Sequence, residues 1–425
     1  MSATFTDPNG FLRQLFDTAV AAADPMKVVA NHLPERPEGR LLVVGAGKAS
    51  ARMAEAVEAA YGPCDGFVIT RYGYARPCQQ IEIVEAAHPV PDQAGVDATL
   101  QLLERVKDLE PQDTVIALIS GGGSSLLCAP VAGLTLEDKQ AVNAALLASG
   151  APISEMNAVR TQLSGVKGGG LAAACAPARV ISLIISDVPG DDPAEIASGP
   201  TVASQSTPQK ALDILNRWSV DVPDAVMTHL KTAGSGMTPQ RRQYVNGEVH
   251  IIAAPSQSLQ AAAEIARAAQ SEVQLLGDAL EGEARDLGAA QAQAALDIRA
   301  KMTAGDAPVL LLSGGECTVT RRGQGVGGPN AEFALSALQT LEGAEGIYAI
   351  ACDTDGVDGA AEVAGACIGP ETLAALPNGL AVARAALADN DAHTYFEKAA
   401  AQVVTGPTLT NVNDFRAFLI LPPKA

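Results

Sequence analysis

Cationic and acidic side chains gather around one apolar strand in the stretch from Met156 to Thr201. Arg160 and Lys167 precede the strand on a segment that we expect to be helical, and Val180 to Ile185 is typical of a strand buried on both faces. Acidic side chains follow where the strand ends: Asp187, Asp191 and Asp192. Ligands of open α/β sheets bind beyond the carboxyl ends of the strands. Cations beside carboxylates therefore favour an anionic, metal-bound ligand such as a nucleotide or a phosphate.

Two glycine-containing loops follow other expected strands. Gly45-Ala46-Gly47-Lys48 joins a strand to a helix, and Ser120 to Ser125 follows the strand Thr114 to Ile119. Glycine lets backbone N–H groups approach an anion, so both loops are candidate phosphate cradles. The first is not a P-loop, because Leu42 replaces the required Gly, and Ser50 leaves its dinucleotide fingerprint incomplete. A tight turn with a solvated lysine and a flexible loop are the alternatives.

A second acidic cluster follows the expected strand Ile347 to Cys352 and contains Asp353, Asp355 and Asp358. It is not an EF-hand, because Gly is missing from the sixth place and Ala364 stands at the twelfth. A metal site and a plain turn both remain open. His88 is alone after a strand, and without a nucleophile-elbow motif we expect it to be structural.

Strands and helices alternate along the chain, which predicts an α/β fold with a Rossmann-like parallel sheet covered by helices on both faces. A chain of 425 residues is long for one core, so we expect two domains. The polar segment Thr238 to Gly247 is the candidate boundary. The expected domains are residues 1–240 and a smaller α/β domain at residues 241–425.

Composition narrows the class of partner. The net charge of −19 argues against nucleic acid and against an anionic membrane surface. No apolar stretch reaches the roughly 18 residues of a membrane span, and the N-terminus lacks the pattern of a signal peptide. The seven scattered cysteines form no metal-ligand pattern and fit small buried side chains in a reducing cytoplasm. The sequence leaves the oligomeric state open, with a homodimer as one candidate.

A series of segments spread over nearly the whole chain resembles the class II glycerate 2-kinase family. These segments are VVGAGKAS, EAAHPVPDQAG, LISGGGSSLL, MNAVRTQLSGVKGGGLA, ISDVPGDDPAEIASGPT, LLLSGGECTVT, GVGGPNAEFAL, CDTDGVDGAAEVAGA and TGPTLTNVNDFR. The resemblance implies a glycerate kinase domain followed by a MOFRL domain. It also implies phosphorylation of D-glycerate at its 2-hydroxyl with ATP and Mg²⁺, in a cleft between the domains.

The family's catalytic lysine falls on Lys48. Many members carry Arg where this chain has Pro329, so another cation, Arg160, Lys167 or Arg321, would replace it, or the substrate is held differently. Our hypothesis gives catalytic roles to Lys48, Asp187 and Arg160, and metal binding to Asp187 and Asp191. It assigns nucleotide contacts to Gly45, Gly47, Ser120, Gly121, Gly122, Gly123, Ser124, Ser125, Lys167, Glu316, Asn330, Asp353 and Asp355.

Two other functions remain as alternatives. One is an NAD(P)H-dependent hydroxypyruvate reductase, a name often given to similar sequences. The incomplete glycine fingerprint weakens it, as does Arg71 where a dinucleotide site usually has an acid, although an arginine there suits the 2′-phosphate of NADP. The other is a non-catalytic protein that binds a sugar acid or a nucleotide. Consumption of ATP separates all three.

Overall fold

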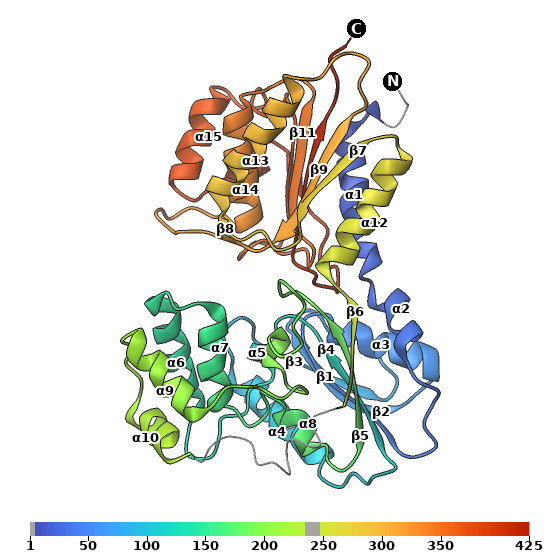
Figure 1. Ribbon diagram of the computed structural model, residues 1–425, viewed down its shortest axis with the longest axis vertical. Coiled ribbons are helices and arrows are strands. Elements are labelled where there is room, and N and C mark those ends of the chain that lie inside the picture. The colour runs from blue at the N-terminus through green and yellow to red at the C-terminus, as the bar shows by residue number, and fades with distance from the viewer. Residues whose placement is uncertain (1–4, 234–246, 425) are drawn as a thin grey trace. The chain divides into compact units, whose positions relative to one another are not determined.

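The computed structural model describes residues 5–233 and 247–424, which form two compact units. One unit spans residues 25–252, and the other combines residues 5–24 with 253–424 (Figure 1). The expected boundary at 240/241 lies outside the described residues, but residues 247–252, which were expected in the second domain, belong to the unit of residues 25–252. The first helix was expected in the N-terminal domain, but it belongs to the unit formed mainly by residues 253–424.

The first helix, α1 (Pro8–Ala22), joins that unit through its apolar side. Phe11, Leu12, Leu15 and Phe16 are buried in one cluster with Leu259 and Ala262 of α12 (Pro255–Ala268) and with Phe415. Asp7 begins the helix by accepting a hydrogen bond from the Gly10 backbone N–H at 2.9 Å. The buried apolar side therefore holds α1 against α12 of the same unit.

The unit of residues 25–252 contains a six-stranded sheet in the order β3-β2-β1-β4-β5-β6. The strands are β1 (Leu41–Ala46), β2 (Asp65–Arg71), β3 (Ile81–Ala86), β4 (Thr114–Ile119), β5 (Arg179–Ile185) and β6 (Glu248–Ala253). All pairs from β3 through β5 are parallel. This is the strand order of doubly wound nucleotide-binding folds, whose ligands bind where the order reverses, between β1 and β4. The predicted fold class is confirmed.

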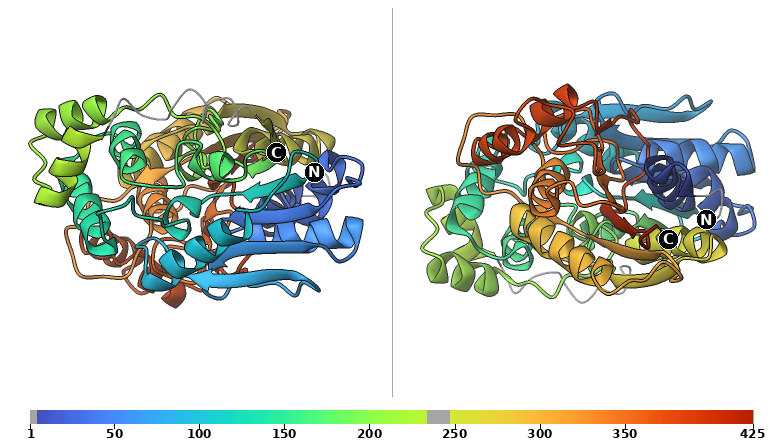
Figure 2. Two further views of the ribbon diagram at one scale, coloured as in Figure 1. Left: turned by 90° about the horizontal axis from the view of Figure 1, so that it is seen from below. Right: turned by 90° about the horizontal axis from the view of Figure 1, so that it is seen from above.

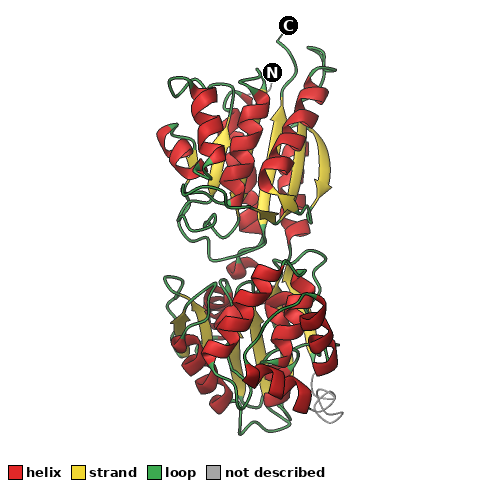
Figure 3. Ribbon diagram, turned by 90° about the vertical axis from the view of Figure 1, so that its left-hand side faces the viewer, coloured by secondary structure: helices red, strands yellow, loops and turns green. Residues whose placement is uncertain are grey.

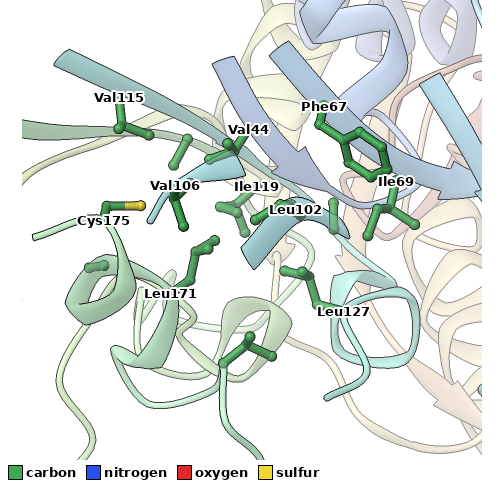
Figure 4. Packing of buried hydrophobic residues seen from close by; sticks show 14 of the residues in the cluster. Val44, Phe67, Ile69, Leu102, Val106, Val115, Ile119, Leu127, Leu171 and Cys175 are labelled. Carbon is green, nitrogen blue, oxygen red and sulfur yellow. The ribbon is translucent and has the colours of Figure 1, made fainter. Parts of the chain in front are cut away.

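Helices cover both faces of this sheet (Figure 3). The helices of this unit are α2 (Pro25–Val28), α3 (Ser50–Tyr61), α4 (Gln93–Arg105), α5 (Gly123–Leu126), α6 (Leu136–Ser149), α7 (Ile153–Gln162), α8 (Gly170–Ala174), α9 (Pro208–Arg217) and α10 (Asp224–Thr232). Figure 4 shows how Leu102 and Val106 near the end of α4, together with Leu171 of α8, meet Val44 and Ile119 of the sheet. These contacts hold α4 and α8 against β1 and β4.

Four of these helices gather at one side of the unit, α6, α7, α9 and α10 (Figure 1; Figure 2, left). They share an apolar core of their own, to which α6 contributes Val142 and Leu146 and α7 contributes Val159. A capping box between Thr135 and Asp138 begins α6. This group of helices positions the cationic side chains described below.

The other unit has a mixed sheet in the order β13-β12-β11-β14-β9-β7. The strands are β7 (Glu272–Gly277), β9 (Val309–Gly315), β11 (Ile347–Asp353), β12 (Gly365–Ile368), β13 (Gln402–Val403) and β14 (Asp414–Ile420). Within this sheet, as far as its residues are described, β7 and β9 pair in parallel and the other neighbouring strands are antiparallel. A short pair, β8 (Gly282–Glu283) with β10 (Cys317–Thr318), lies apart from it.

Alternate residues of these strands face two different helix layers (Figure 1). Leu310 and Leu312 of β9 pack with α1 and α12, whereas Val309 and Leu311 pack with the layer of α13 (Ala284–Arg299) and α14 (Pro329–Leu341). The second layer also holds α15 (Gly379–Ala388) and α16 (Ala392–Lys398). This unit is therefore α/β as predicted, with a sheet buried on both sides.

Two sequence-wide expectations are met within the described residues. All seven cysteines are free thiols, and five of them are buried. Burial raises the pKa of Cys175 to about 12, as expected of a small apolar side chain rather than a reactive thiolate. No helix in the described part of the chain is long and apolar enough to cross a membrane.

Candidate active site

The loops after β1 and β4 lie against each other at the point where the strand order reverses. The Lys48 backbone N–H donates to the Gly121 carbonyl at 2.8 Å, and the Ala49 N–H donates to Ser120 Oγ at 3.0 Å. Ser50 Oγ donates to the Leu118 carbonyl at 2.9 Å. The two glycine loops that the sequence suggested separately are therefore parts of one structure.

Close packing explains part of the glycine pattern. Gly45 lies inside β1 rather than in the loop, and a Cβ on it would come 2.4 Å from the Leu118 carbonyl oxygen. Gly47 has φ +147°, and a Cβ there would lie 2.1 Å from Ser120 Oγ. These glycines let the two loops touch, which makes contact with a ligand an additional role rather than the only explanation.

Lys48 and His88 flank Gly122 in the β4 loop. Gly122 has φ +79°, and a Cβ on it would lie 3.0 Å from His88 Cδ2 and 3.3 Å from Lys48 Cγ. The structure thus brings the imidazole of His88 to the β1/β4 crevice together with the lysine. The sequence alone gave no reason to place His88 there, because its neighbour Gly122 comes from another strand.

Lys167 is buried beside the same loop. Its Nζ donates to the Ser124 carbonyl at 2.6 Å and to the Ser124 hydroxyl, and it lies 3.4 Å from Ser198 Oγ. The expectation that Lys167 lies on a helix is wrong: α7 ends at Gln162, and Gly168 and Gly169 have φ of +56° and +87°. A left-handed turn at these glycines is what directs the lysine inward.

Lys139 of α6 completes a group of cations that the sequence analysis missed. Its Nζ and Arg160 Nε are buried, and neither has a hydrogen-bond partner within the described residues. Arg160 makes only long contacts through its other nitrogens, 3.4 Å to Asn157 Oδ1 and 4.0 Å to Met156 Sδ. Lys139 precedes the buried Val142 and Leu146 by three and seven residues. A lysine on the apolar side of a helix was the sequence signal for it.

Burial and the two neighbouring cations hold the pKa of Lys167 well below its usual range. Burial likewise lowers the pKa of Lys139 and of Arg160. Burial and the repulsion between neighbouring cations both disfavour positive charge on these side chains. An anion placed among them would counteract the repulsion.

The lowered pKa of Lys167 predicts a pH-dependent stability. Between that pKa and the ordinary lysine value of about 10.4, the unfolded chain binds the proton and the folded chain does not. Stability is therefore greatest above this window and declines as the pH falls through it, by up to about 1.4 kcal/mol per pH unit. We expect Lys167→Met to remove this part of the slope in denaturant unfolding, measured downward from the ordinary lysine value of about 10.4. Identical slopes in the variant, the wild type and a Lys210→Met control would contradict this.

The loop after β5 carries the expected acidic residues. Asp191 has φ +55°, and its Oδ1 is buried without a hydrogen-bond partner in the described structure. Asp187 is half-buried at the end of the strand, whereas Asp192 Oδ1 accepts a hydrogen bond from the Ala194 N–H at 2.9 Å in a plain turn. No group of three or more His, Cys, Asp or Glu side chains suited to a metal ion occurs among the described residues. The buried oxygen of Asp191 fits a cation shared with a ligand, since Mg²⁺ takes few protein carboxylates.

The candidate residues of the other unit are mostly engaged within the protein. Asn330 is fully buried and donates through Nδ2 to Asp414 Oδ1 at 2.6 Å. Asp353 Oδ1 accepts the Asp355 N–H at 2.9 Å, and Asp355 Oδ1 accepts the Val357 N–H at 2.8 Å. Such hydrogen bonds favour the turn interpretation of the acidic loop. Glu316 is exposed beyond β9.

Asp358 caps the helix that begins at Pro329. Its carboxylate accepts the backbone N–H groups of Asn330 at 2.9 Å and Ala331 at 2.8 Å, and His393 Nε2 lies 3.1 Å away. Pro329 occupies the first turn, where a missing N–H costs nothing. The free backbone N–H groups at the N-terminus of α14 therefore donate to a protein carboxylate, and Pro329 is a favourable first residue for this helix.

Replacing Asp358 by Ala should destabilise the unit by about 2–4 kcal/mol, because it leaves buried donors unsatisfied. Asp306→Ala is the matched control, since Asp306 also accepts a backbone N–H, that of Thr303 at 2.6 Å, but at an exposed site. We expect the control to cost less than about 1 kcal/mol in denaturant unfolding. Equal losses in the free energy of unfolding of both variants would show that burial does not strengthen the cap that Asp358 provides.

The two units define an α/β protein in which two glycine-containing loops meet at the β1/β4 edge of a doubly wound sheet. The sequence matches the family described as "Domain of unknown function (DUF4147)" over residues 11–231 and the MOFRL family over residues 309–414. The chain therefore belongs to the class II glycerate 2-kinase family, in which these two regions are joined.

Named relatives cover almost the whole chain. It is 37% identical to the "D-glycerate 2-kinase" of Thermotoga maritima, over 96% of this chain and 97% of that protein. It is 53% identical to a "Putative hydroxypyruvate reductase" of Agrobacterium vitis, over 96% and 94% of the two chains. The crystal structure of the Thermotoga maritima glycerate kinase superposes with a TM-score of 0.85 at 35% identity, covering 98% of this chain and all of that one.

Proposed function

We propose that this chain is a glycerate 2-kinase, which transfers the γ-phosphoryl group of ATP to the 2-hydroxyl of D-glycerate and yields 2-phosphoglycerate and ADP. Its strongest support within the molecule is the joined pair of glycine loops at the β1/β4 crevice, with Lys48 between them. The similarity along the whole chain to a D-glycerate 2-kinase points the same way.

Phosphoryl transfer needs positioning and charge stabilisation more than covalent chemistry. Lys48 stabilises the negative charge on the transferring group. In the Ser120–Ser125 loop the N–H groups of Ser120, Gly123 and Ser125 already donate to backbone carbonyls, so those of the remaining residues hold the phosphate oxygens. Arg160 binds the carboxylate of glycerate through its planar fork. Asp187 receives the proton of the 2-hydroxyl or holds the metal ion.

Magnesium is part of the proposal. Asp187 and Asp191 would hold the ion together with phosphate oxygens, and the buried oxygen of Asp191 supplies a ligand of the type that Mg²⁺ prefers. When bound, the ion neutralises negative charge on the nucleotide phosphates.

A hydroxypyruvate reductase is the competing function, because the name of the Agrobacterium vitis protein favours it. The strand order of the sheet is that of dinucleotide-binding domains, and β2 ends in Arg71 instead of an acid. The Arg71 guanidinium lies 5.2 Å from the centre of the Tyr74 ring. An arginine there suits the 2′-phosphate of NADPH, so an NADPH-dependent hydroxypyruvate reductase is the alternative function.

One pair of assays separates the two functions. Purified protein is given D-glycerate, ATP and Mg²⁺ while ADP release is followed, and separately hydroxypyruvate with NADPH or NADH while cofactor oxidation is followed. The kinase proposal predicts ADP release that depends on D-glycerate and no cofactor oxidation. Oxidation of NADPH without any ADP release would replace it by the reductase.

A further inference from the structure

Three cationic side chains line a small cavity that contains no acid. Lys139 of α6, Arg160 of α7 and Lys167 of the following turn meet there with Ser124, Ser125 and Asn143. The cavity measures about 60 Å³, and no Asp or Glu is among its lining residues. All of these residues belong to one unit and lie within the described part of the chain.

Burial of these three cationic side chains lowers the stability of the ligand-free protein. A buried charge without a partner loses its hydration and gains nothing in return. Among the residues that the structure describes, Lys139 Nζ and Arg160 Nε are both buried without a hydrogen-bond partner, and Lys167 donates only to neutral oxygens of Ser124 and Ser198. Buried polar groups without partners call for a specific explanation, and an anionic ligand supplies one here.

The size of the cavity limits the anion to a small group. Pockets for drug-sized ligands occupy about 300–1,000 Å³, so a cavity of about 60 Å³ admits one end of a small molecule and not a triphosphate chain. An arginine fork beside two lysines suits a carboxylate, which accepts hydrogen bonds at both oxygens.

We propose that Lys139, Arg160 and Lys167 together form the subsite for the carboxylate of a small hydroxy acid, and that Lys139 determines specificity for the acid. The identity of the acid rests on the proposed function, whereas the subsite itself rests on the cavity. The role of Lys139 goes beyond that function, which assigns only Arg160 to the carboxylate.

The subsite is linked to the phosphate loop through α5. Ser124 and Ser125 line the cavity and lie two and three residues after Gly122, beside which Lys48 and His88 lie. Ser125 Oγ also donates to the Pro89 carbonyl at 2.7 Å, one residue from His88. An acid held in the cavity would have its remaining carbons within a short distance of the crevice, as transfer to a 2-hydroxyl requires.

Lys139→Met tests the proposal with two readouts: the affinity for D-glycerate should fall, and the stability of the ligand-free protein should rise. Loss of one charged hydrogen-bond donor should raise the KM for D-glycerate about 10- to 100-fold while leaving the KM for ATP unchanged. The same change removes an unpaired buried charge, so the ligand-free variant should melt at a higher temperature than the wild type. Lys210→Met, at an exposed position on α9, is the matched control and should change neither value.

Calorimetric titration with D-glycerate in the absence of nucleotide keeps this test separate from the proposed function. Wild-type protein that binds D-glycerate without phosphorylating it would refute the kinase function and retain the subsite, provided that Lys139→Met weakens the binding. Unchanged D-glycerate binding in Lys139→Met would overturn the subsite, as would an increase confined to the KM for ATP. A folded variant that melts below the wild type and binds D-glycerate as the wild type does would also overturn it, because Lys139 would then be a structural residue. Lys139→Gln repeats the test if Lys139→Met does not fold.

Discussion

Replacing Lys48 by Met is expected to lower kcat with D-glycerate and ATP by roughly 10²- to 10³-fold, the usual loss when one preorganised charge-stabilising donor is removed. The free energy of unfolding should change little, because the loop is held by the backbone N–H of Lys48, which donates to Gly121, and this bond survives the change. Methionine keeps most of the unbranched apolar stem of the side chain and removes its ammonium group.

Steady-state kinetics and denaturant unfolding of Lys48→Met, beside the Lys210→Met control, check this result. A parallel fall in kcat and kcat/KM would indicate an interaction made in the transition state. Turnover within a few-fold of wild type would show that Lys48 is a solvated lysine on a tight turn, the alternative that the sequence left open.

Gly122→Ala should cost about 10²-fold in activity, because its methyl group would contact both His88 and Lys48 in the crevice. Gly73→Ala provides a matched control. The two glycines have φ of +79° and +83°, so both alanines bear the same left-handed strain of about 1–2 kcal/mol. A Cβ on Gly73, however, would meet no atom within 4 Å.

Melting temperatures and kcat of the two glycine variants separate strain from crowding. We expect similar losses of stability and a loss of activity in Gly122→Ala alone. If both variants kept wild-type activity, the β1/β4 crevice would not be where the reacting groups lie. If both lost activity equally, the effect would come from strain and not from the position of Lys48 and His88.

Local patterns were enough to predict the sheet of residues 25–252. Apolar runs such as Thr114–Ile119 followed by glycines mark buried strands and the loops at their ends, and both features depend on near neighbours. The two loops that these patterns indicated, after β1 and β4, do meet in the structure. The sequence suggested the loops separately, and their meeting depends on the pairing of β1 with β4, because the carboxyl ends of neighbouring parallel strands share one edge.

Features that depend on distant partners were not predictable in this way. The apolar side of α1 shows that it must be buried but does not show that α12 covers it. Lys139 became a site residue only when the packing of α6 beside α7 placed it next to Arg160. The same limit applies to Asp358, whose spacing suggested a metal loop and whose carboxylate instead caps α14, nearly thirty residues earlier.

The most direct test of the account is the identity of the phosphorylated product. Purified protein would be incubated with D-glycerate, ATP and Mg²⁺, and the product would be examined by phosphorus NMR against authentic 2- and 3-phosphoglycerate. The proposed function predicts a phosphate ester at the 2-hydroxyl, formed in step with ADP. Formation of the 3-isomer would contradict the proposed placement of the acid, and absence of any phosphorylated glycerate would contradict the kinase function itself.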